Sequence, residues 1–90
     1  MVSRDIEITS DLGIHLRPAG AMCDEAIKYQ SHISFEYGHN KRVANAKSII
    51  SILASGVGKG EFIKLMADGE DEEEAIEKVS SAFIKSMNDN

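Results

Sequence analysis

The chain has a single cysteine, a single proline and no long apolar run. With Cys23 alone, neither a disulfide within the chain nor a metal centre built from cysteines can form, and a reducing compartment is expected. No segment reaches the roughly 20 apolar residues that a membrane-spanning helix needs. The N-terminus also lacks the charged stretch and following apolar run of a signal peptide. We therefore expect a cytoplasmic protein without membrane insertion.

Basic residues are also few, because 10 lysines and arginines stand against 15 aspartates and glutamates, for a formal net charge of −5. Binding to nucleic acid irrespective of its sequence needs a basic face for the phosphate backbone, so we expect no nucleic-acid partner. The 90 residues, 42 % of them hydrophobic, are enough for one modest core. We expect a single domain over residues 1–90 and a monomer.

The spacing of apolar residues predicts seven secondary-structure elements. Alternation predicts four strands, over Val2–Thr9, Ile33–Tyr37, Lys41–Ala44 and Phe62–Ala67. Helical spacing predicts three helices, over Leu16–Tyr29, over the short run Ile49–Leu53 that stops before Gly56, and from Asp71 to a frayed end at Asn88–Asn90. The resulting order, β-α-β-β-α-β-α, fits a two-layer α+β fold with the helices covering one face of a sheet.

The most informative stretch is Gly13-Ile14-His15-Leu16-Arg17-Pro18, which has a histidine just before a predicted helix. Proline is tolerated in a helix only near its start, so Pro18 indicates that the helix begins close to His15. A neutral imidazole nitrogen can accept a phosphoryl group, and the positive end of a helix disfavours the protonated ring. The backbone N–H groups of Leu16 and Arg17, together with the Arg17 side chain, can then bind the phosphoryl oxygens.

Short motifs also occur by chance, so the alternative for His15 is an ordinary exposed histidine in a turn. The other two histidines, His32 and His39, are expected in exposed loops and lack the spacing of a metal site. The stretch Gly56–Gly60 fails the pattern of a nucleotide-binding loop and is predicted to be a plain turn. We therefore expect neither a metal nor another cofactor.

Three segments, GIHLRPAG, NAKSIISILASG and KLMADGEDEEEAIEKV, resemble HPr, the histidine-containing phosphocarrier family of the bacterial sugar phosphotransferase system. The resemblance runs in order over nearly the whole chain. It implies an open-faced β-sandwich, with a four-stranded antiparallel sheet and three helices on one side. It also implies that phospho-enzyme I phosphorylates His15, that Arg17 contacts the phosphoryl group, and that enzyme IIA domains of sugar permeases receive it.

The same resemblance implies a second, regulatory site at Ser48. HPr kinase/phosphorylase would modify this serine, and the modified form would bind a catabolite control repressor. The resemblance also matches Ile49, Ile50 and Leu53 to an apolar patch that docks onto partners. Independently of the resemblance, a helix this short cannot bury Ile52 and all three of these residues, so part of the surface is expected to remain for partners.

Three further functions remain open beside the sugar carrier. These are a regulatory binding module centred on Ser48, a carrier in a dedicated nitrogen- or dihydroxyacetone-type relay, and an interaction domain without phosphate chemistry. Four residues depart from the family pattern. Leu12 stands where many members have serine or asparagine, Leu16 replaces a small residue, and Asp24 and Ile27 stand where many have lysines. Fewer positive charges should weaken the attraction of acidic partners.

Overall fold

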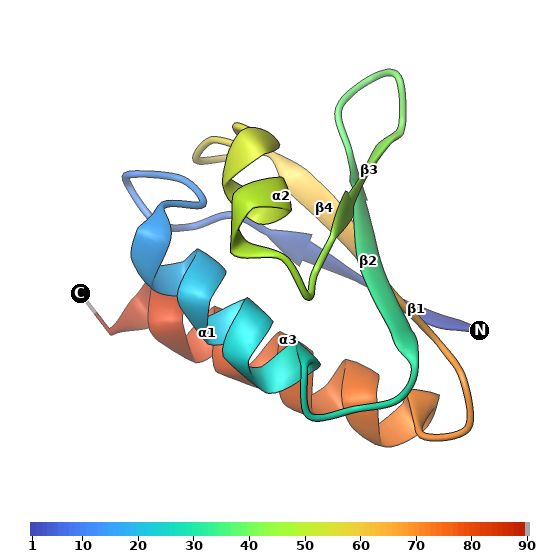
Figure 1. Cartoon of the computed structure of the whole chain (residues 1–90). Coiled ribbons are helices and arrows are strands. Elements are labelled where there is room, and N and C mark those ends of the chain that lie inside the picture. Colours follow the sequence, from blue (N-terminus) through green and yellow to red (C-terminus); the bar gives the residue numbers. More distant parts are fainter. Residues whose placement is uncertain (90) are drawn as a thin grey trace.

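A computed structural model describes residues 1–89 as a four-stranded sheet with three helices on one of its faces (Figure 1). The strands are β1 (Val2–Glu7), β2 (His32–Tyr37), β3 (Arg42–Asn45) and β4 (Phe62–Asp68). The helices are α1 (Leu16–Ala26), α2 (Ile49–Ala54) and α3 (Glu72–Asn88). The strand order is β1-β4-β2-β3, and every neighbouring pair is antiparallel. The predicted fold class and element order are confirmed.

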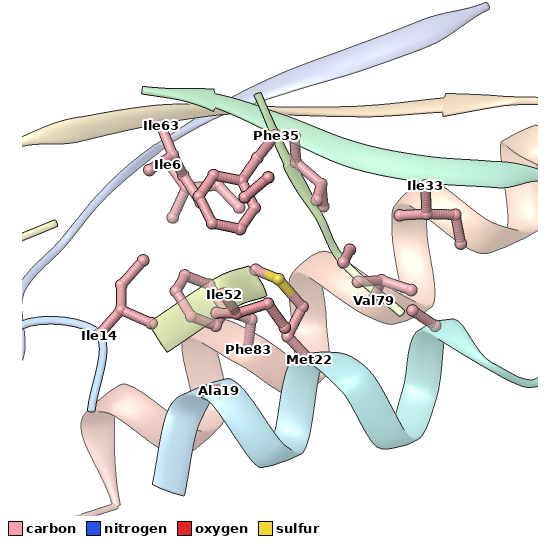
Figure 2. Close-up of a cluster of buried hydrophobic side chains, with 14 of the residues drawn as sticks. Ile6, Ile14, Ala19, Met22, Ile33, Phe35, Ile52, Ile63, Val79 and Phe83 are labelled. Atoms are coloured by element: carbon pink, nitrogen blue, oxygen red, sulfur yellow. The ribbon is translucent and has the colours of Figure 1, made fainter. Parts of the chain in front are cut away.

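The hydrophobic core lies between the sheet and the helices because alternate strand residues point toward the helices. The strand register pairs Ile6 with Ile63, and both of these inward side chains are almost completely shielded from solvent. Figure 2 shows Ile63 and Phe35 of the sheet on one side of the core and Phe83 of α3 on the other. Each such side chain contributes about 1.5–3 kcal/mol when fully buried. Cys23 is buried in the same cluster.

Several predicted element ends were wrong, and for α1 and β3 the local backbone shows the reason. Helix α1 ends at Ala26 rather than Tyr29, because Tyr29 N donates to the Ala26 carbonyl in a tighter turn. Strand β3 begins one residue late because Lys41 has a φ of +51°, which belongs to the preceding turn. The first strand stops at Glu7, and the expected loop residue His32 is the exposed first residue of β2.

At the C-terminus, Asn88 is the last residue of α3 rather than part of a frayed end. The prediction for Asn90 lies outside the described residues. Within residues 1–89, no helix is both long enough and apolar enough to cross a lipid bilayer.

Candidate functional site

His15 is the N-cap residue of α1, and it leads into the helix with an extended backbone (φ −98°, ψ −173°). Its carbonyl accepts the first hydrogen bond of the helix, from Ala19 N at 3.0 Å. The N–H groups of Leu16 and Arg17 precede that bond and have no acceptor within the helix, while Pro18 has no N–H at all. The His15 side chain makes no capping bond to these amides. Within residues 1–89, these two donors have no partner, and they lie with the positive end of the helix dipole beside a half-buried imidazole.

Arg17, the second candidate site residue, lies in the first turn of α1, two residues after His15. It is exposed, and within residues 1–89 its guanidinium has no hydrogen bond or ion pair. Two lysines elsewhere on the surface are already paired: Lys28 with Glu25 at 3.1 Å, and Lys59 with Asp11 at 2.6 Å. Arg17 is therefore available to bind an anion next to His15, with donors that suit phosphate oxygens.

The loop that leads to His15 is held against the loop between α2 and β4. Ile14 N donates to the Val57 carbonyl at 3.0 Å. Gly13 has a φ of +70°, and a Cβ atom there would lie 2.5 Å from the same carbonyl oxygen. The close approach therefore requires glycine. The stretch Gly56–Gly60 is the turn that the sequence predicts. Its contact with the loop before His15 was not predicted, and the one signal for it in the sequence was Gly13.

A second support that sequence reasoning missed is Asp71, for which the sequence predicted only the start of the last helix. Its carboxylate accepts hydrogen bonds from Gln30 N at 2.9 Å and from Ser31 N at 3.0 Å, as well as from the Ser31 hydroxyl. These bonds, the hydroxyl bond foremost, hold the pKa of Asp71 below its usual range. Asp71 thereby attaches the chain that follows α1 to the start of α3.

Ser48 is the N-cap residue of α2, and its Oγ accepts a hydrogen bond from Ser51 N at 3.2 Å. The side chain is half-buried. Its hydroxyl therefore already occupies the position that an anion would take at the start of this short helix.

The apolar residues of α2 divide into a buried and an exposed set. Ile52 is fully buried, and Ile49 is half-buried and packs against the core. Ile50 is 81 % exposed, and Leu53 is also exposed. The prediction that this helix leaves apolar surface free is confirmed, although Ile49 contributes less of it than Ile50 and Leu53. Within residues 1–89, no group of three or more His, Cys, Asp or Glu side chains is placed to hold a metal ion.

Comparison with known proteins supports the resemblance to the HPr family. The family model described as the PTS HPr component phosphorylation site matches residues 2–85. The phosphocarrier protein HPr of Buchnera aphidicola subsp. Acyrthosiphon pisum is 42 % identical over 80 residues, which cover 89 % of this chain and 92 % of that protein.

Solved structures agree with the sequence relatives. The histidine-containing phosphocarrier protein of Mycoplasma superposes with a TM-score of 0.90 at 30 % identity over 96 % of each chain. An HPr dimer from Thermoanaerobacter tengcongensis superposes with a TM-score of 0.71 at 37 % identity, over 97 % of this chain and 98 % of that one. Because that relative is a dimer, the monomeric state of this chain stays a prediction. A match over residues 2–85, a close curated relative and a shared fold show that this chain belongs to the HPr family, the phosphocarriers of the phosphotransferase system.

Proposed function

We propose that His15 accepts a phosphoryl group from phospho-enzyme I and passes it to enzyme IIA domains of sugar permeases. The observation that carries this proposal is the half-buried imidazole at the start of α1, beside two amides and a guanidinium that have no partner among the described residues 1–89. During loading, the bond from phosphorus to the donor breaks while a ring nitrogen of His15 forms a new P–N bond. The amides of Leu16 and Arg17 and the Arg17 side chain offset the negative charge that arrives.

The test is intact-mass spectrometry at neutral pH after incubation with enzyme I, magnesium and phosphoenolpyruvate. We expect one acid-labile phosphate on the wild-type chain and none on His15→Ala. Because the His15 side chain makes no capping bond, this variant should keep the wild-type circular dichroism spectrum. A folded wild-type chain that stays unmodified by its cognate enzyme I, while that enzyme loads another carrier, would refute the proposal. A regulatory binding module without carrier chemistry would then be the better description.

We further propose that Ile50 and Leu53 form the contact surface for these partners, with Ile49 at its buried edge. Their exposure on a helix whose Ile52 anchors it to the core supports this role. In this proposal the carrier is a cytoplasmic, single-domain monomer over residues 1–90. Replacing Leu53 by serine should raise the KM for the chain as substrate of enzyme I, whereas a substitution on the outer face of the sheet should leave it unchanged.

Regulation at Ser48 is the second part of the proposal, with HPr kinase/phosphorylase as the modifying enzyme and a catabolite control repressor as the partner of the modified form. A phosphate there adds about −1.5 to −2 charges beside Ile50. That charge suits the helix start but opposes docking of an apolar or acidic surface. Ser48→Asp should therefore slow the loading of His15. Ser48→Ala should lose only the capping bond to Ser51, about 0.5–2 kcal/mol of stability, and load normally.

A further inference from the structure

Within residues 1–89, the helices cover only one face of the sheet, and the other face carries a row of charged side chains (Figure 1). Asp5 of β1 is paired with Lys64 of β4, and Lys64 is paired in turn with Glu36 of β2. Their chain neighbours Ile6 and Phe35 are buried in the core on the helix side. Because successive strand residues point to opposite faces, the three charged side chains point away from the helices, and the Cβ atoms of each pair lie about 4.5–5.5 Å apart.

These three side chains line a hollow of about 210 Å³ together with Phe62 and Lys41. Phe62 is 62 % exposed, and it also lines a second hollow of about 300 Å³, so the two hollows adjoin. The first hollow is smaller than the roughly 300–1,000 Å³ of sites for drug-sized ligands, and it therefore suits a smaller molecule. It offers such a molecule an aromatic ring, two carboxylates and two ammonium groups.

The four charged groups of the first hollow do not neutralise one another by direct contact. Within residues 1–89, none of these side chains makes a hydrogen bond or an ion pair, although the register places Lys64 between Asp5 and Glu36. A phosphate ion would therefore meet two unpaired carboxylates, and a polyamine would meet two unpaired ammonium groups, so either ligand would be repelled by like charges. A small molecule with one charge of each sign finds a partner for both.

We propose that the first hollow binds a free α-amino acid with an apolar side chain. The ligand's ammonium group contacts the two carboxylates of the hollow, its carboxylate contacts the two lysines, and its side chain packs on Phe62. A free amino acid fits better than a segment of a protein, because peptide bonds remove both charges inside a chain. Solvent screens the charges of this exposed site, so we expect weak binding, with a Kd of about 1 mM.

The test is a titration of the full chain with L-phenylalanine, followed by the chemical shifts of its backbone amides. Two analogues each lack one charge: N-acetyl-L-phenylalanine has no ammonium group, and L-phenylalaninamide has no carboxylate. With L-phenylalanine up to about 20 mM, we expect saturable shifts that centre on the residues of the hollow, with a Kd of about 1 mM. Each analogue should bind at least about fivefold more weakly.

A matched pair of variants tests whether the charge must lie in the hollow. Lys64→Gln removes a cation from the hollow, whereas Lys78→Gln removes an equally exposed cation from α3. We expect Lys64→Gln to raise the Kd about fivefold and Lys78→Gln to leave it unchanged. Phe62→Ala should also raise the Kd, because it removes the apolar contact. All three side chains are exposed, so the variants should keep the wild-type circular dichroism spectrum.

Four results would overturn the inference. These are the absence of saturable shifts, shifts that centre outside the hollow, equal affinity for L-phenylalanine and either analogue, and an equal Kd in Lys64→Gln and Lys78→Gln. The titration needs neither enzyme I nor a phosphoryl donor, so its outcome is independent of whether His15 carries a phosphoryl group.

Discussion

Replacing Gly13 by alanine tests how firmly the loop that carries His15 is held. The new Cβ atom would lie 2.5 Å from the Val57 carbonyl oxygen and 2.9 Å from the Gly58 Cα, both backbone atoms that cannot rotate away. The φ of +70° costs an alanine about 1–2 kcal/mol. Relieving the clash must also stretch the hydrogen bond from Ile14 N to Val57, worth about 1 kcal/mol. We expect Gly13→Ala to lose about 2–3 kcal/mol of stability.

Two other glycines provide matched controls for the same added methyl group. Gly38 has a φ of +76° with no atom within 4 Å of the added Cβ, so Gly38→Ala should show the backbone strain alone, about 1–2 kcal/mol. Gly20 lies inside α1 with equally open space, so Gly20→Ala should gain about 0.5–1 kcal/mol from helix propensity.

Urea unfolding followed by far-UV circular dichroism measures all three changes, since the chain has no tryptophan to report by fluorescence. Thermal melts give a second reading, at about 4–8 °C for each kcal/mol in a chain of this size. From the most to the least stable, the expected order is Gly20→Ala, wild type, Gly38→Ala and Gly13→Ala. Equal losses in Gly13→Ala and Gly38→Ala would refute the reasoning, because they would mean that Val57 does not restrict the His15 loop.

Three further predictions concern single contacts. The pKa of Asp71 is lowered in the folded chain, so the stabilisation by its carboxylate is complete above its unfolded pKa, about 4, and is lost as the pH falls through the folded pKa. Asp71→Asn should therefore lower Tm at neutral pH and flatten the decline of Tm in acid. Parallel curves of Tm against pH for the variant and the wild type would contradict this. Ile52→Ala should lose about 2–5 kcal/mol in urea unfolding, whereas Ile50→Ala should stay within about 0.5 kcal/mol of the wild type. Arg17→Ala should unfold like the wild type yet load His15 about tenfold more slowly or worse by intact mass, and an unchanged rate would mean that the guanidinium does not touch the phosphoryl group.

The local sequence pattern was enough to predict the helices and strands and the position of His15 at a helix start. Proline restricts the backbone so strongly that Pro18 alone indicated where α1 begins. The alternation of Ile6 and Ile8 indicated which face of the first strand is buried. Element ends were less predictable, because the tight turn after Ala26 depends on which carbonyl each amide finds.

The supports of the site could not be predicted because their partners are distant in sequence. Asp71 bonds to Ser31, 40 residues earlier, and nothing in the acidic run around Asp71 indicates which residue will face it. The Val57 carbonyl lies against Gly13 only after α2 and β4 have packed. The exposure of Ile50 beside the burial of Ile52 likewise follows from how α2 lies on the core.

The position of His15 at a single helix start has a consequence for the order of events in the proposed relay. One imidazole and one surrounding surface serve both the donor and the acceptor, so the two proteins exclude each other sterically. Each phosphoryl group must then travel on a free carrier between two separate encounters, as in a ping-pong scheme. Flux is set by how fast the carrier leaves one protein and finds the next, and every acceptor in the cell competes with the donor for the same few side chains.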